Sequence, residues 1–184
     1  MKVAFGENAD AIELHTAWTA GDFSTLPKIE VRSRSDINGA NGAYAAAINT
    51  TYISQEVLKQ NAGNVEAIAS VVLEEIGHAI DSQLNISDTP GDEGEIFAYL
   101  AQGIELSESE LQRLKAEDDR VTVNLDGKNL QIEQASSVCD RFIYNQATGA
   151  LFFDADGTGT KQTQVQIATL ATKPVIGFND IFVI

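Results

Sequence analysis

The segment NVEAIASVVLEEIGHAIDSQ, residues 64–83, carries the clearest regular pattern in the chain. Its apolar side chains recur with the 3.6-residue period of an α-helix, and Asn64 is a residue type that caps helix N-termini. We therefore expect a helix over residues 64–83, with one apolar face that packs against the rest of the fold. The apolar positions are Val65, Ile68, Ala69, Val72, Ile76, Ala79 and Ile80.

Two polar residues of this predicted helix, Glu74 and His78, are four positions apart and so share one face. Glu75 lies beside that face. The layout is that of the HExxH motif, with Glu74 in place of the first histidine. In HExxH two imidazoles hold zinc, and the glutamate takes a proton from the metal-bound water. The spacing makes Glu74 and His78 candidate metal ligands, and Glu75 the candidate catalytic base.

A metal site of this kind needs a third ligand, which we expect from a second helix. Residues 85–92 are rich in turn-forming types, and a helical pattern follows over residues 92–102. Glu95 comes 95 − 78 = 17 residues after His78, near the start of that helix, which could pack back on the first. We predict Glu95 as the third ligand, with Glu93 as its substitute.

The remaining patterns before residue 136 mix helices with strands, which predicts an α+β domain over residues 1–136. Ser107 and Glu110 have the spacing of a capping box for a third helix. Asp126-Gly127, between two alternating runs, is a strong signal for a β-hairpin. We expect helices at 9–20 and 108–118, and strands at 28–32, 43–53, 120–125 and 129–134.

Beyond residue 136 the helical period disappears, and short β-like runs alternate with turn-rich segments. We place a domain boundary there and expect residues 137–184 to form a small β-rich tail. The runs are RFIY, ALFF, QVQIATL and DIFVI.

Composition restricts the partners that the chain can have. Its 27 acidic and 12 basic side chains give a net charge of −15, which argues against nucleic acid and against anionic membrane surfaces. No apolar run approaches the roughly 20 residues of a membrane span. The single cysteine, Cys139, excludes an intramolecular disulfide framework and a CxxC zinc site, and nothing in the sequence assigns it a role.

The negative charge is concentrated in residues 60–112, which contain eleven acids and no lysine or arginine. Such a segment either solvates a surface or collects cations. The acids are Glu66, Glu74, Glu75, Asp81, Asp88, Asp92, Glu93, Glu95, Glu105, Glu108 and Glu110.

Three segments resemble the zincin superfamily of metallopeptidases. LEEIGHAID, residues 73–81, resembles the zincin active-site helix, and GDEGEIFAYL, residues 91–100, resembles the next helix, which supplies a glutamate ligand in the gluzincin branch. GAYAAAINTTYIS, residues 42–54, resembles the edge strand above a zincin cleft. The resemblance implies a zincin-like mixed domain that hydrolyses a peptide or protein substrate with a metal ion. The chain departs from the family at Glu74, where zincins have histidine.

This departure leaves three interpretations open. The chain could be an atypical metallopeptidase with Glu74, His78 and Glu95 around a divalent metal, zinc first. The carboxylates shift the preference toward manganese, iron or calcium. It could be an inactive zincin-fold module that acts in binding, cation capture or export. It could also be a plain amphipathic helix with exposed acids and a hydrogen-bonded histidine.

Residues 141–184 resemble the C-terminal ends of repeats-in-toxin proteins, which the type I export machinery secretes. The similarity lies in RFIYNQATGALFFDADGTG, residues 141–159, and in the apolar last residues. It implies an extracellular protein exported without an N-terminal signal peptide. Asp154 and Asp156 are candidates for a weak calcium site, although the calcium-binding nonapeptides of such proteins are missing. Residues 1–136 are similar to N-terminal parts of large cyanobacterial secreted proteins.

Overall fold

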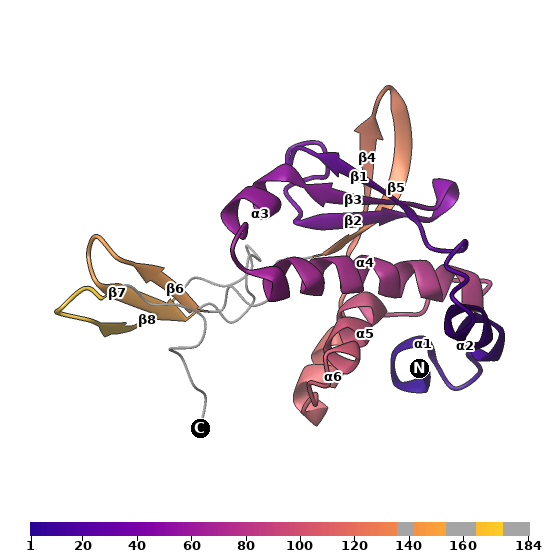
Figure 1. Ribbon diagram of the computed structural model, residues 1–184. Helices are drawn as coiled ribbons and strands as arrows, with labels where there is room; N and C mark the ends of the chain where they lie inside the picture. Colours follow the sequence, from indigo (N-terminus) through magenta and orange to yellow (C-terminus); the bar gives the residue numbers. More distant parts are fainter. Residues whose placement is uncertain (136–141, 154–164, 175–184) are drawn as a thin grey trace. The chain divides into compact units, whose positions relative to one another are not determined.

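The computed structural model describes residues 1–135, 142–153 and 165–174 (Figure 1). The chain divides into two compact units, Met1–Val138 and Cys139–Ile184. The described residues form a mixed α+β structure with helices and two sheets, as the sequence predicted. The predicted boundary at residue 136 and Asp154 and Asp156 of the predicted calcium site lie outside the described residues.

The described part of the first unit contains six α-helices, a short 3-10 helix and five strands. No helix among the described residues is both long and apolar enough to cross a membrane. The helices are α1 (Lys2–Phe5), α2 (Ile12–Thr19), α3 (Gln55–Gln60), α4 (Val65–Leu84), α5 (Glu93–Ala101), α6 (Glu108–Leu114) and η1 (Ala46–Ile48); the strands are β1 (Lys28–Arg32), β2 (Gly42–Ala45), β3 (Thr50–Ser54), β4 (Arg120–Leu125) and β5 (Lys128–Ala135).

The sheet has the strand order β1-β3-β2-β5-β4, in which β1 is parallel to β3 and the other pairs are antiparallel. The predicted hairpin is confirmed, with positive φ at Asp126 (51°) and Gly127 (81°). The single strand expected over 43–53 is wrong. It is two antiparallel strands, because the chain reverses through η1 and through Asn49, whose left-handed φ of 44° ends the extended conformation.

Helix α4 runs along the sheet and contacts β2, β3 and β5, while α5 packs against α4 on the side away from the sheet (Figure 1). Two glycines let the helix backbones meet: a Cβ added at Gly77 would lie 2.7 Å from the Cα of Gly94. A buried apolar cluster that includes Phe5, Ile80 and Ile96 joins this helix pair to α1. This packing fixes the beginning of α5 against the middle of α4.

The second unit contains a three-stranded antiparallel sheet in the order β6-β7-β8. Its strands are β6 (Phe142–Asn145), β7 (Ala150–Phe153) and β8 (Val165–Thr169), which fall in the predicted runs RFIY, ALFF and QVQIATL. The predicted run DIFVI lies outside the described residues.

Candidate metal centre

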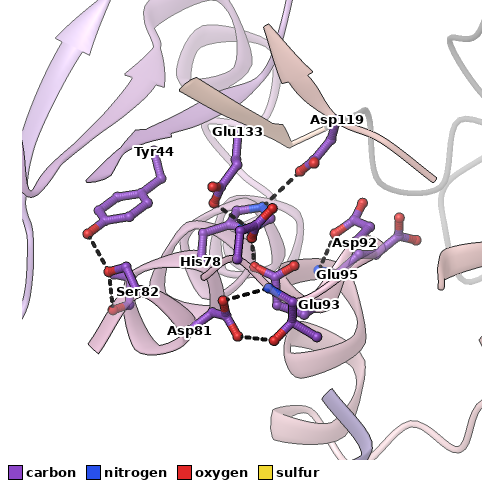
Figure 2. A network of polar contacts seen from close by, with 12 residues as sticks. Tyr44, His78, Asp81, Ser82, Asp92, Glu93, Glu95, Asp119 and Glu133 are labelled. Carbon is purple, nitrogen blue, oxygen red and sulfur yellow. Dashed lines mark hydrogen bonds and ion pairs between the residues drawn. The ribbon is translucent and has the colours of Figure 1, made fainter. Parts of the chain in front are cut away.

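One buried histidine, His78, is surrounded by acidic side chains from four parts of the first unit (Figure 2). Its side chain has no solvent exposure, so each polar contact that it makes is with the protein. Helix α4 supplies Glu74, the beginning of α5 supplies Asp92 and Glu93, the turn before β4 supplies Asp119, and β5 supplies Glu133.

Local sequence determines how these side chains are held. Glu74 and His78 lie one turn apart on α4, which begins where the Asn64 side chain accepts a hydrogen bond from the Ala67 N–H. Asp92 caps α5, because its Oδ1 accepts a hydrogen bond from the Glu95 N–H at 2.7 Å. The second oxygen of Asp92, Oδ2, is buried and has no hydrogen-bond partner.

The two ring nitrogens of His78 have different surroundings. Nδ1 lies 2.8 Å from Glu93 Oε1 in a hydrogen bond and 3.2 Å from Glu133 Oε2. Nε2 is buried without a hydrogen-bond partner. When neutral His78 donates its Nδ1–H to Glu93, the lone pair on Nε2 is left for another group. A carboxylate bound to the far nitrogen is the usual support for a metal-bound imidazole.

Glu74, His78 and Asp92 have the arrangement of a metal-binding group. One ligand atom of each lies within 4.8 Å of the other two. Both carboxylate oxygens of Glu74 are buried and have no hydrogen-bond partner. Buried charges without a partner cost several kcal/mol each, roughly, and native proteins satisfy such groups with a counter-charge or an ion. This buried Glu/His/Asp cluster can hold a metal ion.

The pKa values of the centre show how little positive charge the protein itself provides. Burial, and then the charges of Asp92, Glu95 and Glu75, raise the pKa of the Glu74 carboxyl well above its usual value. Burial lowers the pKa of His78, but the hydrogen bond and charge of Glu93 outweigh this and raise it well above its usual value. The cluster therefore needs positive charge, either from protons or from a metal ion that displaces them.

Glu95, the predicted third ligand, lies beside this group. Its ligand atom is within 4.8 Å of those of Asp92 and Glu117, and Arg113 Nη2 is 3.5 Å from its Oε1. Asp92, and not Glu95, is the third residue of the group that contains Glu74 and His78. Glu93, the predicted substitute, contacts the other nitrogen of His78.

Glu75, the predicted catalytic base, connects α4 to the sheet. It is fully buried, and its Oε1 accepts a hydrogen bond from the Ala135 N–H at 3.2 Å. A Cβ added at Gly42 would lie 2.5 Å from the same oxygen, so β2 passes very close to this carboxyl group. The other oxygen, Oε2, is buried and has no hydrogen-bond partner.

Asp81 holds the loop between α4 and α5. Its Oδ1 accepts hydrogen bonds from Asn85 Nδ2 at 2.7 Å and Thr89 Oγ1 at 2.5 Å, and its Oδ2 accepts from the Thr89 N–H at 3.0 Å. This loop brings Asp92 and Glu93 back toward His78, so Asp81 stabilises the centre indirectly.

Sequence reasoning missed Asp92, Asp119 and Glu133 as parts of the centre. A partial signal existed, because the Asp126-Gly127 hairpin pairs Arg120 with Glu133 and so makes Asp119 and Glu133 neighbours. That register does not reveal that the two acids face His78, which depends on how the hairpin packs against α4.

In comparisons with known proteins, no family model, curated protein or solved structure matches the chain. The geometry of the centre and its chemistry are therefore the basis for assigning a function.

Proposed function

We propose that the first unit is a cation-binding module in which Glu74, His78 and Asp92 hold one divalent metal ion. The main support is the unpartnered state of the donor atoms. Both oxygens of Glu74, Nε2 of His78 and Oδ2 of Asp92 are buried without hydrogen bonds, and the three residues lie within ligand reach of each other. A metal ion satisfies all of these atoms together, which a single hydrogen-bond donor does not.

The donor set restricts the ion. Imidazole nitrogen suits zinc, iron and other first-row metals, whereas calcium and magnesium prefer oxygen ligands alone. Zinc binds both imidazole nitrogen and carboxylate oxygen, the two donor types of this group. We propose zinc as the ion, with manganese or iron(II) as the competitors that a carboxylate-rich centre favours.

Metal analysis of the purified full chain tests this proposal. We expect one equivalent of metal in the wild type and a loss of it in Glu74→Ala, His78→Ala and Asp92→Ala variants. Glu66→Ala is the matched control, because Glu66 is an exposed acid on the same helix. Glu95→Ala distinguishes Asp92 from Glu95 as the third ligand. If this variant keeps its metal, Asp92 is the third ligand, and if it loses the metal, Glu95 is. Equal, negligible metal in the wild type and all variants would refute metal binding.

Metal-dependent hydrolysis of peptides is the second candidate function, and Glu75 supports it. The buried Oε2 of Glu75 has no hydrogen-bond partner and belongs to the residue that acts as the base in the HExxH layout. Glu75→Gln should then abolish hydrolysis of a protein substrate while the metal stays bound. Wild-type protein that is loaded with metal but inactive on a panel of peptides would favour the non-enzymatic module.

We also propose that the chain is exported by type I machinery to the extracellular space. The support is the sequence similarity of residues 141–184 to repeats-in-toxin ends. Deletion of residues 141–184 should keep the protein inside cells that carry such machinery. Continued secretion of the shortened chain would contradict this proposal.

A further inference from the structure

Strand β1 forms one edge of the five-stranded sheet, and its outer side pairs with no other strand among the described residues (Figure 1). The Lys28 N–H donates a hydrogen bond to the carbonyl oxygen of Asn49 at 3.1 Å, on the side of β3. The backbone groups of successive residues point to opposite sides of a strand, so those of Ile29 and Val31 point away from β3. Two residues of β1 thus offer their N–H and C=O groups to another strand.

The side chains of the same two residues leave apolar surface open at this edge. Ile29 and Val31 are 55% and 56% exposed, and side-chain alternation places both on one face of the strand. On that face lies an apolar pocket between the sheet and α4, lined by Leu26, Pro27, Ile29, Thr51, Val72 and Ile76. An edge that combines unpaired backbone with exposed apolar side chains is a template for pairing with another chain.

The other face of β1 carries alternating charges, which restrict how two copies of the strand can pair. Three antiparallel registers bring the outward-pointing backbone groups together, and they are centred on Ile29, Glu30 or Val31. The register centred on Ile29 places Lys28 of each copy opposite Glu30 of the other, and such opposite charges attract across strands. The register centred on Glu30 instead places Lys28 opposite Arg32 and the two copies of Glu30 opposite each other, which is repulsive.

The apolar pocket distinguishes the two remaining registers. With Ile29 at the centre, Val31 of the second copy lies opposite Pro27, beside the pocket, and its N–H can bond to the Pro27 carbonyl oxygen. With Val31 at the centre, Ser33 of the second copy lies opposite Ile29, and no apolar side chain reaches the pocket. Charge and apolar surface therefore both favour the register centred on Ile29.

We propose that the chain forms a symmetric dimer in which β1 pairs antiparallel with β1 of a second copy, centred on Ile29. The contact joins two five-stranded sheets into one continuous sheet and covers the exposed apolar side chains of both copies. No residue of β1 belongs to the candidate metal centre, so the dimer does not depend on the proposed binding of an ion.

Sedimentation equilibrium of the full chain over a range of concentrations tests the proposal. We expect a dimeric wild type, and a dissociation constant raised roughly tenfold or more in Glu30→Lys, because this variant has a lysine opposite Lys28 at two positions of the contact. The double variant Lys28→Glu/Glu30→Lys restores opposite charges and should restore the dimer. Glu13→Lys is the matched control, because it makes the same change of charge at an exposed position of α2.

Oxidative cross-linking tests the register in a Cys139→Ser background, which removes the only native cysteine. Two residues in a hydrogen-bonded antiparallel pair have Cα atoms about 5.5 Å apart, which suits a disulfide, so Ile29→Cys should give a covalent dimer. Val31→Cys is the matched control, because in this register the two copies of residue 31 are offset by four residues, roughly 13 Å.

Three results would overturn the proposal. The first is a monomeric wild type, which would leave the edge to an extended segment of a different protein. The second is a dimer that is as tight in Glu30→Lys as in the wild type, or no tighter in the double variant than in Glu30→Lys. The third is cross-linking of Val31→Cys in place of Ile29→Cys.

Discussion

Acidic side chains occur in two opposite settings in the first unit. In the Arg32 cluster, formed by Lys28, Glu30, Arg32 and Asp126, every acid faces a base: Arg32 Nη2 lies 2.7 Å from Asp126 Oδ2 and 3.1 Å from Glu30 Oε2. Hydrogen bonds from Lys28 and Arg32 lower the pKa of the Glu30 carboxyl, and a hydrogen bond from Arg32 lowers that of Asp126. The acids of this cluster are exposed or half-buried and are satisfied by the chain itself.

In the candidate metal centre of Glu74, His78 and Asp92, the acids are buried, and burial raises the pKa of both carboxyl groups well above their usual values. No lysine or arginine is close enough to form an ion pair with either of these two acids among the described residues. The contrast shows that the number of acids says little about function. A buried acid without a base beside it has the properties expected of a ligand for an added cation.

The largest expected effect is the stabilisation of the fold by metal. An ion that binds only the folded chain adds about 2.7 kcal/mol at a free concentration 100 times its Kd, which raises the melting temperature of a chain of this size by roughly 5–10 °C. Thermal unfolding with and without zinc measures the shift. The shift should vanish in His78→Ala and persist in Arg32→Ala. If zinc, manganese and iron(II) all leave the melting temperature of the wild type unchanged, the buried acids around His78 are not a cation site.

The next effect concerns Glu93, which accepts a hydrogen bond from His78 Nδ1 and so orients the ring. A carboxylate in this position typically contributes about 10- to 100-fold to metal affinity, so Glu93→Gln should weaken binding by that factor without abolishing it. Competition with a chromophoric chelator measures the affinity. A complete loss of metal would instead mean that Glu93 is itself a ligand, with the ion at Nδ1 and Glu133 beside it.

The sequence was informative wherever a signal was local. Ser107 and Glu110 form the predicted capping box, because both reciprocal hydrogen bonds depend only on residues three apart. The Asp126-Gly127 turn was predictable for the same reason. The reversal at Asn49 was not, since β-branched and aromatic residues on both sides favour extended structure and hide a single left-handed residue.

In the candidate metal centre, too, only the features that depend on local sequence could be predicted. The pairing of Glu74 with His78 follows from helical periodicity. The position of Glu95 depends on where α5 begins: with Asp92 as the cap, Glu95 lies near Arg113 and Glu117. Asp119 comes from a hairpin whose packing against α4 is a tertiary property, so no local pattern marks it.

A smaller effect is expected where the helices cross. The added methyl group of Gly94→Ala would lie 2.5 Å from His78 Nε2 and 2.7 Å from the Glu74 carbonyl oxygen, and neither α4 nor the ring can move without disturbing the core. Overpacking of this kind costs about 1–3 kcal/mol of stability. Urea denaturation measures it. Gly63→Ala is the control, because a Cβ there would have no atom within 4 Å apart from those of its chain neighbours. Equal stability of the two variants would contradict the close crossing.

The smallest effect is expected from Arg32→Ala at neutral pH, because exposed ion pairs stabilise a fold weakly and are screened by salt. Glu30 and Asp126 have lowered pKa values in the folded chain, so the stability from their pairing is present above about pH 4 and is lost as the pH falls through those lowered values. Denaturation at neutral and acidic pH should show a small difference between wild type and variant that disappears in acid.

Arg32→Lys keeps the charge and serves as the control for this variant. The two clusters share no residue, so zinc should stabilise Arg32→Ala as much as it stabilises the wild type. A variant that responds less to zinc than the wild type would show that the Arg32 cluster and the candidate metal centre are coupled, and that the acids of the Arg32 cluster are not satisfied independently.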